Sequence, residues 1–248
     1  MGTRLRVGRF AGSGRGVGRA GACVLIASLA TTACTNGKPD LDLLTAPNAT
    51  ATGAEEVDTA GLMRIAKAAE GNESVVDPAV VYRRIIERDP SAVEPHIKLG
   101  DLLLRRGDLD GAEKAFRSAR ELAPDSVDAQ NGVARVLLSR SRFEDAAAIL
   151  AAVLKREPLN VTALGSMGLA MDGLGRSAEA QTHYRQALQV DPTNRVVRNN
   201  LGLSLARSGQ YDEAIQLLQK LANEPGAEPR HRETLARVVA MKDAARRR

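Results

Sequence analysis

The chain has 248 residues, of which 44% are hydrophobic and only 2% aromatic, and its formal net charge is +5. Five arginines precede Cys34 and no acid does, so removing them (+5 − 5) leaves about zero for the remainder. This balance excludes the basic face that a nucleic-acid binder needs. Alanine and leucine, both strong helix formers, dominate, and no stretch alternates at period two. We therefore predict an all-α fold.

The first 33 residues have the pattern of a secretory leader. Residues 1–20 are rich in arginine and glycine, residues 21–30 are largely apolar, and Thr31, Thr32 and Ala33 are small. A basic start, a short apolar core and small residues at a cut site are typical of a signal peptide. The apolar run is too short to span a bilayer as a helix of the mature protein. We predict that residues 1–33 are a lipoprotein-type signal peptide.

The segment Leu29–Cys34 resembles the lipobox of bacterial lipoproteins, with Thr31 in the place where that motif has leucine. The resemblance implies that Cys34 is lipidated and that its acyl chains anchor the protein to a membrane. Because Thr35 follows, and not aspartate, it also implies an outer-membrane address with the folded part facing the periplasm. The alternative is an exported protein in which Cys34 is incidental. Cys23 is the only other cysteine, so no disulfide can form within the processed chain.

Residues 34–57 separate the leader from the rest of the chain. They contain Thr, Asn, Gly, Pro, Asp and Ala without helical periodicity. Such a composition buries too little apolar surface to fold. We predict a disordered tether.

Beyond this tether the sequence repeats every 34 residues. Four kinds of position recur at this step, namely a proline (Pro90, Pro124, Pro158, Pro192), a small residue (Gly100, Ala134, Gly168, Gly202), an alanine (Ala112, Ala146, Ala180, Ala214) and a bulky residue (Tyr82, Phe116, Leu150, Tyr184, Leu218). A small residue lets two helices approach closely, the bulky residue fills the space opposite it, and proline breaks a helix. Each unit is therefore predicted to be a hairpin of two helices.

These positions resemble the tetratricopeptide repeat in length and in the placing of small, bulky and breaker residues. The resemblance implies a right-handed superhelical solenoid of about five helix hairpins over residues 58–243. We divide it into repeats 59–92, 93–126, 127–160, 161–194 and 195–228, followed by a capping helix at 229–241.

Local signals indicate where these helices begin and end. N-cap residue types precede three of the first helices, at Ser126, Asn160 and Asn194. Glycine stands in three of the turns inside hairpins, at Gly107, Gly175 and Gly209. Ser141 and Glu144 have the spacing of a capping box, which predicts a side-chain cap on the second helix of that repeat. Pro78 falls in the first turn of a second helix, where proline is tolerated.

No constellation of residues indicates catalysis. His96, His183 and His231 lie in different repeats without metal-ligand or triad spacing. No thiol remains after processing, and the glycines of residues 14–18 follow no strand, so they do not form a phosphate-binding loop. We predict a protein that is not an enzyme and uses no metal or cofactor.

In the tetratricopeptide family the first helices line a concave groove that takes extended peptides or partner helices. By helical phase we predict that this partner groove contains Ile97, Asp101, Leu104, Asn131, Arg135, Leu138, Gly165, Leu169, Asp172, Asn199, Leu203 and Ala206. Asparagine could bond a bound backbone, since its amide both donates and accepts hydrogen bonds.

Three segments, Arg198–Ala206, Gly209–Ile215 and Pro225–Arg230, resemble the TadD family of lipoproteins that serve Tad (tight adherence) pilus assembly. The resemblance implies an envelope scaffold that binds the pilus secretin or assembly factors of a Tad/Flp-type pilus. Two alternatives remain open. One is a general periplasmic tetratricopeptide adaptor or co-chaperone unrelated to pili, and the other is a regulator of an enzyme such as a cell-wall hydrolase.

Overall fold

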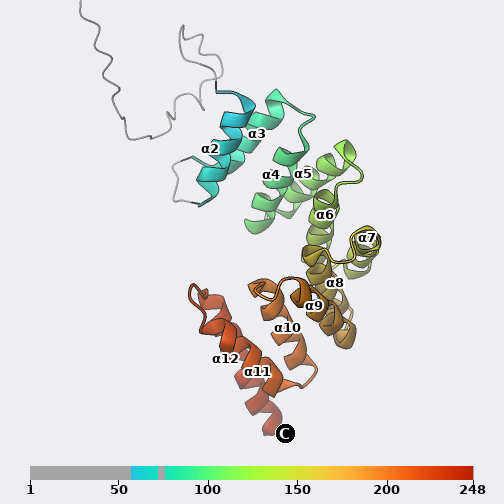
Figure 1. Cartoon of the computed structure of the whole chain (residues 1–248), viewed down its shortest axis with the longest axis vertical. Coiled ribbons are helices and arrows are strands. Elements are labelled where there is room, and N and C mark those ends of the chain that lie inside the picture. Colours follow the sequence, from blue (N-terminus) through green and yellow to red (C-terminus); the bar gives the residue numbers. More distant parts are fainter. Residues whose placement is uncertain (1–56, 72–75, 248) are drawn as a thin grey trace, which may run out of the picture. The chain divides into compact units, whose positions relative to one another are not determined.

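The computed structural model describes residues 57–71 and 76–247. Within these two ranges it contains eleven helices and no strand (Figure 1). The predicted all-α solenoid is therefore confirmed. The predicted leader, the lipidation site Cys34 and the tether up to residue 56 lie outside the described residues.

Ten of these helices form five hairpins. The first helices of the hairpins are α2 (Thr59–Gly71), α4 (Val93–Arg105), α6 (Val127–Ser139), α8 (Val161–Gly173) and α10 (Arg195–Arg207). The second helices are α3 (Pro78–Arg88), α5 (Leu109–Leu122), α7 (Phe143–Arg156), α9 (Ser177–Val190) and α11 (Tyr211–Ala222). Each of the 34-residue units proposed from the sequence contains one first and one second helix.

The hairpins stack in chain order. Each helix packs against the next one along the chain, and α4, α6, α8, α10 and α12 (Pro229–Arg246) also contact one another in succession (Figure 1). Each repeat thus buries its apolar face against its neighbours, as a solenoid requires. The first helices together make one continuous surface.

Inside three of the hairpins a glycine of the first helix faces a large residue of the second, at Gly100, Gly168 and Gly202. A Cβ atom added to Gly100 would lie 2.8 Å from the Phe116 ring, and one added to Gly168 would lie 2.5 Å from the Tyr184 ring. These distances are shorter than van der Waals contact, so only glycine lets the helix axes approach this closely. The predicted pairing of small and bulky positions is confirmed.

Polar side chains cap the helix starts that the sequence indicates. Ser126, Asn160 and Asn194 each accept a hydrogen bond from the backbone N–H three residues later. Asp77 caps α3 by accepting from the Ala79 N–H at 2.9 Å, and Pro78 occupies the first helical position. A side-chain cap of this kind contributes about 1 kcal/mol.

The predicted capping box at Ser141 is wrong. The N-cap of α7 is Arg142, which makes no side-chain capping bond, and Ser141 has a φ of +58°. Ser141 occupies the turn position that Gly107, Gly175 and Gly209 hold in other hairpins, with φ of +80°, +75° and +78°. The hairpin turn therefore requires left-handed backbone here, and this requirement overrides the local Ser-x-x-Glu pattern.

Replacing Ser141 with glycine is expected to raise the free energy of unfolding by about 1 kcal/mol, because left-handed backbone strains a residue with a Cβ atom. Urea denaturation followed by circular dichroism measures the change. The reverse substitution, Gly175→Ser, serves as the matched control. A Cβ atom at Gly175 meets nothing within 4 Å. Gly175→Ser should therefore lower the free energy of unfolding by a similar amount, through backbone strain alone. No gain for Ser141→Gly would contradict the assignment.

The last helix is longer than predicted. It runs to Arg246 and not to about Met241, because Lys242, Ala244 and Ala245 are good helix formers and Lys242 pairs with Asp212 of α11. At its start, His231 is buried and its Nδ1 accepts a hydrogen bond from the Glu228 backbone N–H at 3.1 Å.

Candidate functional site

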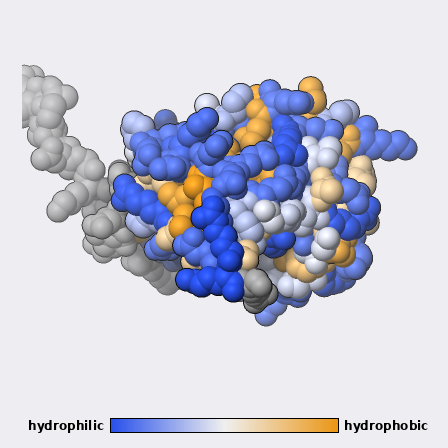
Figure 2. Space-filling view, turned by 90° about the horizontal axis from the view of Figure 1, so that it is seen from below, coloured by the Kyte–Doolittle hydropathy of each residue, from blue (hydrophilic) through white to orange (hydrophobic). Residues whose placement is uncertain are grey.

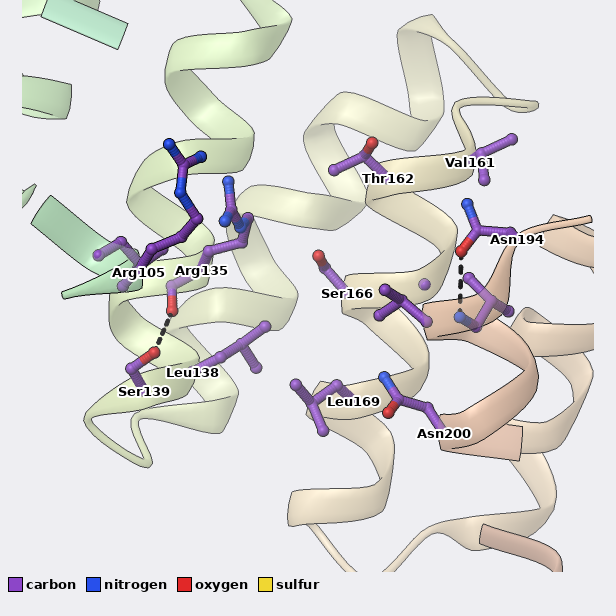
Figure 3. Close-up of a pocket in the computed structure, with 14 residues that line it drawn as sticks. Arg105, Arg135, Leu138, Ser139, Val161, Thr162, Ser166, Leu169, Asn194 and Asn200 are labelled. Atoms are coloured by element: carbon purple, nitrogen blue, oxygen red, sulfur yellow. Dashed lines mark hydrogen bonds between the residues drawn. The ribbon is translucent and has the colours of Figure 1, made fainter. Parts of the chain in front are cut away.

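Three neighbouring cavities lie along the first helices. One is formed by α4, α6 and α8 and has a volume of about 500 Å³. The central one lies between α4, α6, α8 and α10, with a volume of about 600 Å³ (Figure 3). The third, of about 310 Å³, is lined by residues of α8, α9, α10 and α12.

The cavities share lining residues and therefore form one surface, which we call the first-helix groove. Arg135 and Thr162 line both the first and the central cavity. Leu169 and Asn200 line both the central and the third. A partner segment that fills the central cavity would thus reach the other two without leaving the groove.

The centre of the groove presents solvent-exposed apolar side chains among polar ones. Leu169 is 40% exposed and Val196 is 56% exposed, and both line the central cavity together with Leu138. Figure 3 shows Leu138 on α6, and Leu169 with Ser166 on α8 across from it. Elsewhere the exposed surface is mixed, and on the face shown in Figure 2 hydrophobic patches are separated by hydrophilic side chains. Exposed apolar side chains in a concave site are typical of a binding surface.

Charged side chains gather toward the α4 end of the groove. Arg135 donates to Asp101 at 2.5 Å, which joins α6 to α4. Glu94, Lys98 and Asp128 line the same cavity. Arg135 is therefore neutralised by its own chain, and the groove carries no strong charge of one sign there.

Most of the residues predicted from helical phase line these cavities. Ile97, Asp101, Asn131 and Arg135 line the first cavity, Leu104, Leu138, Gly165 and Leu169 the central one, and Leu203 the third. Asn199 lines none of the three, and Ala206 is buried. The amide oxygens of Asn131 and Asn199 are buried and have no hydrogen-bond partner in the described part of the chain.

Asp172 lies inside the fold and not on the groove surface. Its side chain is 1% exposed, and it accepts hydrogen bonds from Ser204 Oγ at 2.8 Å and Tyr184 OH at 3.2 Å. Arg207 of α10 adds an ion pair at 2.6 Å. Asp172 has the same helical phase as Leu104 and Leu138, but neighbouring side chains cover it. Asp172 therefore joins α8, α9 and α10 and is not available to a partner.

A second cluster of the same kind occurs in the first hairpin. Tyr82 OH donates to Glu70 at 2.6 Å, and Arg105 pairs with Glu70 at 2.7 Å. Burial, and after it the hydrogen bond to Glu70, raises the pKa of Tyr82. Burial, and after it the charge of Asp172, raises the pKa of Tyr184 in the same way. Both phenols therefore stay protonated and serve as hydrogen-bond donors.

The sequence analysis missed these clusters, although the sequence contains a signal for them. An acid stands twelve residues before each of the two buried tyrosines, and an arginine stands 35 residues after each acid. Where the bulky residue is Phe116, Leu150 or Leu218, the residue twelve places earlier is Leu104, Leu138 or Ala206. A buried phenol needs an acceptor, which Glu70 and Asp172 provide, and an arginine then pairs with each acid. Asp172 is buried, whereas the Glu70 side chain is 25% exposed.

Several groove residues were also missed. Thr162, Ser166, Val196 and Asn200 line the central cavity. Thr162 and Val196 lie three residues before the predicted positions Gly165 and Asn199, and Ser166 and Asn200 lie directly after them. The groove-facing side of these helices is therefore wider than helical phase predicted.

The described helices include none that is long and apolar enough to cross a membrane. Residues 57–71 and 76–247 also contain no group of three or more histidine, cysteine or acidic residues that could hold a metal ion.

Comparison with known protein families gives two matches, both to the tetratricopeptide repeat. One covers residues 79–127, 97–161 and 131–171, and the other covers residues 173–238. Together they span more than half of the 248 residues. The chain belongs to the tetratricopeptide-repeat family. Tetratricopeptide-repeat proteins typically act as scaffolds that bind other proteins, and neither match is to a catalytic family.

Solved structures support the tetratricopeptide-repeat fold. A thermophilic tetratricopeptide-repeat protein of Thermus thermophilus, TTC0263, is 16% identical with a TM-score of 0.66, covering 74% of this chain and all of that one. MamA of Desulfovibrio magneticus is 22% identical with a TM-score of 0.53, covering 65% and 92%. A tetratricopeptide-repeat protein of Parabacteroides merdae is 19% identical with a TM-score of 0.55, covering 75% of each chain. No curated protein matches the sequence.

Proposed function

We propose that the protein is a non-enzymatic scaffold whose first-helix groove binds an apolar segment of a partner protein. The observation that carries this proposal is the pair of exposed side chains, Leu169 and Val196, in the central cavity. Burying such side chains against a partner contributes about 25 cal/mol per Å² of apolar area. The two arginines of that cavity, Arg105 and Arg135, are paired with Glu70 and Asp101. The centre of the groove therefore favours apolar side chains over a charged ligand.

Leu169→Glu is expected to abolish capture of the groove partner from an envelope extract, because a carboxylate in the apolar centre would have to be desolvated on binding. Capture on immobilised protein, with quantitative mass spectrometry, compares this variant with the wild type. The expected loss is at least about tenfold.

Val190→Glu is the matched control, since Val190 is 44% exposed but lies at the end of α9, outside the three cavities. It should capture the same proteins as the wild type. Equal capture by Leu169→Glu and the wild type would show that the groove is not the binding surface.

We also propose that the protein acts in the cell envelope as a lipoprotein anchored at Cys34. The support is the leader pattern and the lipobox-like segment before Cys34. Metabolic labelling with a palmitate analogue should mark the wild-type protein and leave Cys34→Ser unlabelled. Equal labelling of both, or of neither, would contradict the anchor.

The narrower proposal is that the groove partner belongs to the assembly of a Tad/Flp-type pilus, with the secretin as the first candidate. Its support is the sequence resemblance, which includes the segment Pro225–Arg230. In the structure this segment is held by Arg195, which donates to the carbonyls of Pro225 at 2.6 Å and Gly226 at 2.9 Å. The turn thus sets the position of α12 relative to α10.

Deletion of the gene should lower the amount of secretin multimer or of Flp pili, and expression of Leu169→Glu should fail to restore them. Immunoblotting of unheated envelope samples and shear assays of pili measure both. Unchanged secretin and piliation in the deletion strain would instead favour the general periplasmic adaptor or co-chaperone.

A further inference from the structure

The four repeats from residue 93 to residue 228 bury the same apolar stripe of their first helices. The stripe consists of an apolar residue, the small residue next to it and an apolar residue one turn later. In α4, α6, α8 and α10 its members are Leu99, Gly100 and Leu103; Val133, Ala134 and Leu137; Met167, Gly168 and Met171; and Leu201, Gly202 and Leu205. All twelve are buried.

Helix α12 carries the same stripe, 34 residues further on, as Leu235, Ala236 and Val239. Here Ala236 is exposed and Val239 is 38% exposed, whereas Leu235 is half-buried and packs against the hydrophobic core at one edge of the stripe. The side of α12 that meets the preceding repeat is buried, through His231 and Val238. Helix α12 packs on α10 and α11, and no described helix follows it to take the place of a second helix. It therefore has the geometry of a first helix whose second helix is missing from the described residues.

The chain itself shows what kind of helix fits this stripe. In the four second helices α5, α7, α9 and α11, an alanine is followed four residues later by a large residue and three residues after that by an alanine or an aliphatic residue. These triplets are Ala112, Phe116 and Ala119; Ala146, Leu150 and Val153; Ala180, Tyr184 and Ala187; and Ala214, Leu218 and Leu221, all of them fully buried.

Charge decides between the possible occupants. Helix α12 contains five cations, at positions 230, 232, 237, 242 and 246, and two acids, at positions 233 and 243, a balance of +3. Arg232 and Arg246 fall on the helical phase of the exposed stripe, one at each end, and Asp243, one turn before Arg246, falls on the same phase. A second copy of α12 would place like charges together, which is unfavourable. An antiparallel helix with acids in its first turn would place them near Arg246, and all four second helices from α5 to α11 have such acids.

We propose that the exposed stripe Leu235, Ala236 and Val239 of α12 docks an acidic amphipathic helix of a partner protein, in the place that a second helix holds in each complete repeat. This surface is separate from the central cavity of the first-helix groove, because none of its three residues lines that cavity. The protein would thus have two binding surfaces for partners of different chemistry.

The test uses a synthetic helix as the probe. A fluorescein-labelled, capped peptide copying residues 209–224, which include α11, is titrated with the full chain and followed by fluorescence anisotropy. Saturable binding is expected, and Val239→Asp should weaken it by at least about tenfold, because it places a charge in the apolar contact. Ala236→Phe should weaken it similarly by filling the space for the large residue of the probe.

Two kinds of control make the result specific. On the protein, Val190→Asp should bind as the wild type, and circular dichroism should show that all variants keep their helix content. On the peptide, Leu218→Asp should abolish binding, and the pair Asp212→Lys and Glu213→Lys should weaken it at low salt.

Four outcomes would overturn the proposal. The first is no saturable binding, and the second is unchanged binding by Val239→Asp. The third is loss of binding in Val196→Asp, which would locate the peptide in the groove. Sedimentation showing a dimer that Val239→Asp dissociates would assign the stripe to a second copy and also overturn it. The groove proposal is unaffected by any result with Val239→Asp, because its own test rests on Leu169.

Discussion

Arg207→Met is expected to lower the free energy of unfolding by about 2–3 kcal/mol, because it leaves the buried Asp172 carboxylate without its cation. Asp172 is almost fully buried, and its only charged partner in the described part of the chain is Arg207. Loss of one partner of a fully buried ion pair costs about 3–5 kcal/mol. The smaller value applies here because Arg207 is 47% exposed and because Ser204 and Tyr184 still donate to the carboxylate. Urea denaturation at neutral pH measures the loss.

Arg185→Met provides the matched control for this measurement. Arg185 pairs with Glu213 at 3.1 Å, but both side chains are about half exposed. Surface ion pairs contribute about 0–1 kcal/mol, so this variant should unfold close to the wild type. Equal losses from Arg185→Met and Arg207→Met would show that the burial of Asp172 has no special effect.

The other repeats suggest how to repair the loss. Adding Asp172→Leu and Tyr184→Phe to Arg207→Met recreates the combination that the chain already uses at Leu104 and Phe116. Replacing a buried ionic cluster by apolar residues of similar volume is often neutral or stabilising. The triple variant should therefore recover part of the lost stability, although it leaves Ser204 Oγ without the Asp172 acceptor. Asp172→Leu alone leaves both Ser204 Oγ and Tyr184 OH without their acceptor and should not recover it.

Gly132→Ala is expected to lower the free energy of unfolding by about 2 kcal/mol, because the new methyl group would overlap the Phe116 ring. A Cβ atom at Gly132 would approach ring atoms of Phe116 far inside van der Waals contact. Phe116 is fully buried and also contacts Gly100, where an added Cβ atom would lie 2.8 Å from the ring. The ring is therefore closely surrounded and cannot move aside without disturbing its neighbours. The gain in helix propensity, about 1 kcal/mol, offsets only part of the cost.

Gly165→Ala tests whether the effect is one of space and not of composition. An added Cβ atom there meets only Val197, at 3.1 Å, so a small shift relieves the contact and the helix propensity should bring the net change close to zero. Phe116→Leu should partly rescue Gly132→Ala, because a leucine takes less room than the ring. A double-mutant cycle gives the coupling, expected to be about 1 kcal/mol. Additive losses would contradict the proposed overlap.

The sequence alone determined the stack of helix hairpins, because its information is local and repeated. Spacing of 34 residues, a small residue opposite a bulky one and a proline after each second helix can be satisfied together only by such a stack. Most of the groove positions also followed from helical phase, since residues such as Ile97 and Leu169 line the cavities that the first helices form.

Only the tertiary structure decided which of these positions a neighbour covers and which backbone a turn requires. Asp172 has the phase of a groove residue, but side chains of α9 and α10 enclose it. Ser141 has the sequence of a helix cap, but the hairpin turn places it in left-handed backbone. The stripe on α12 has the same pattern as the buried ones, but its Ala236 and Val239 are exposed because no described helix covers them. Helical phase gives the direction of a side chain, whereas burial depends on what packs against it from another part of the chain.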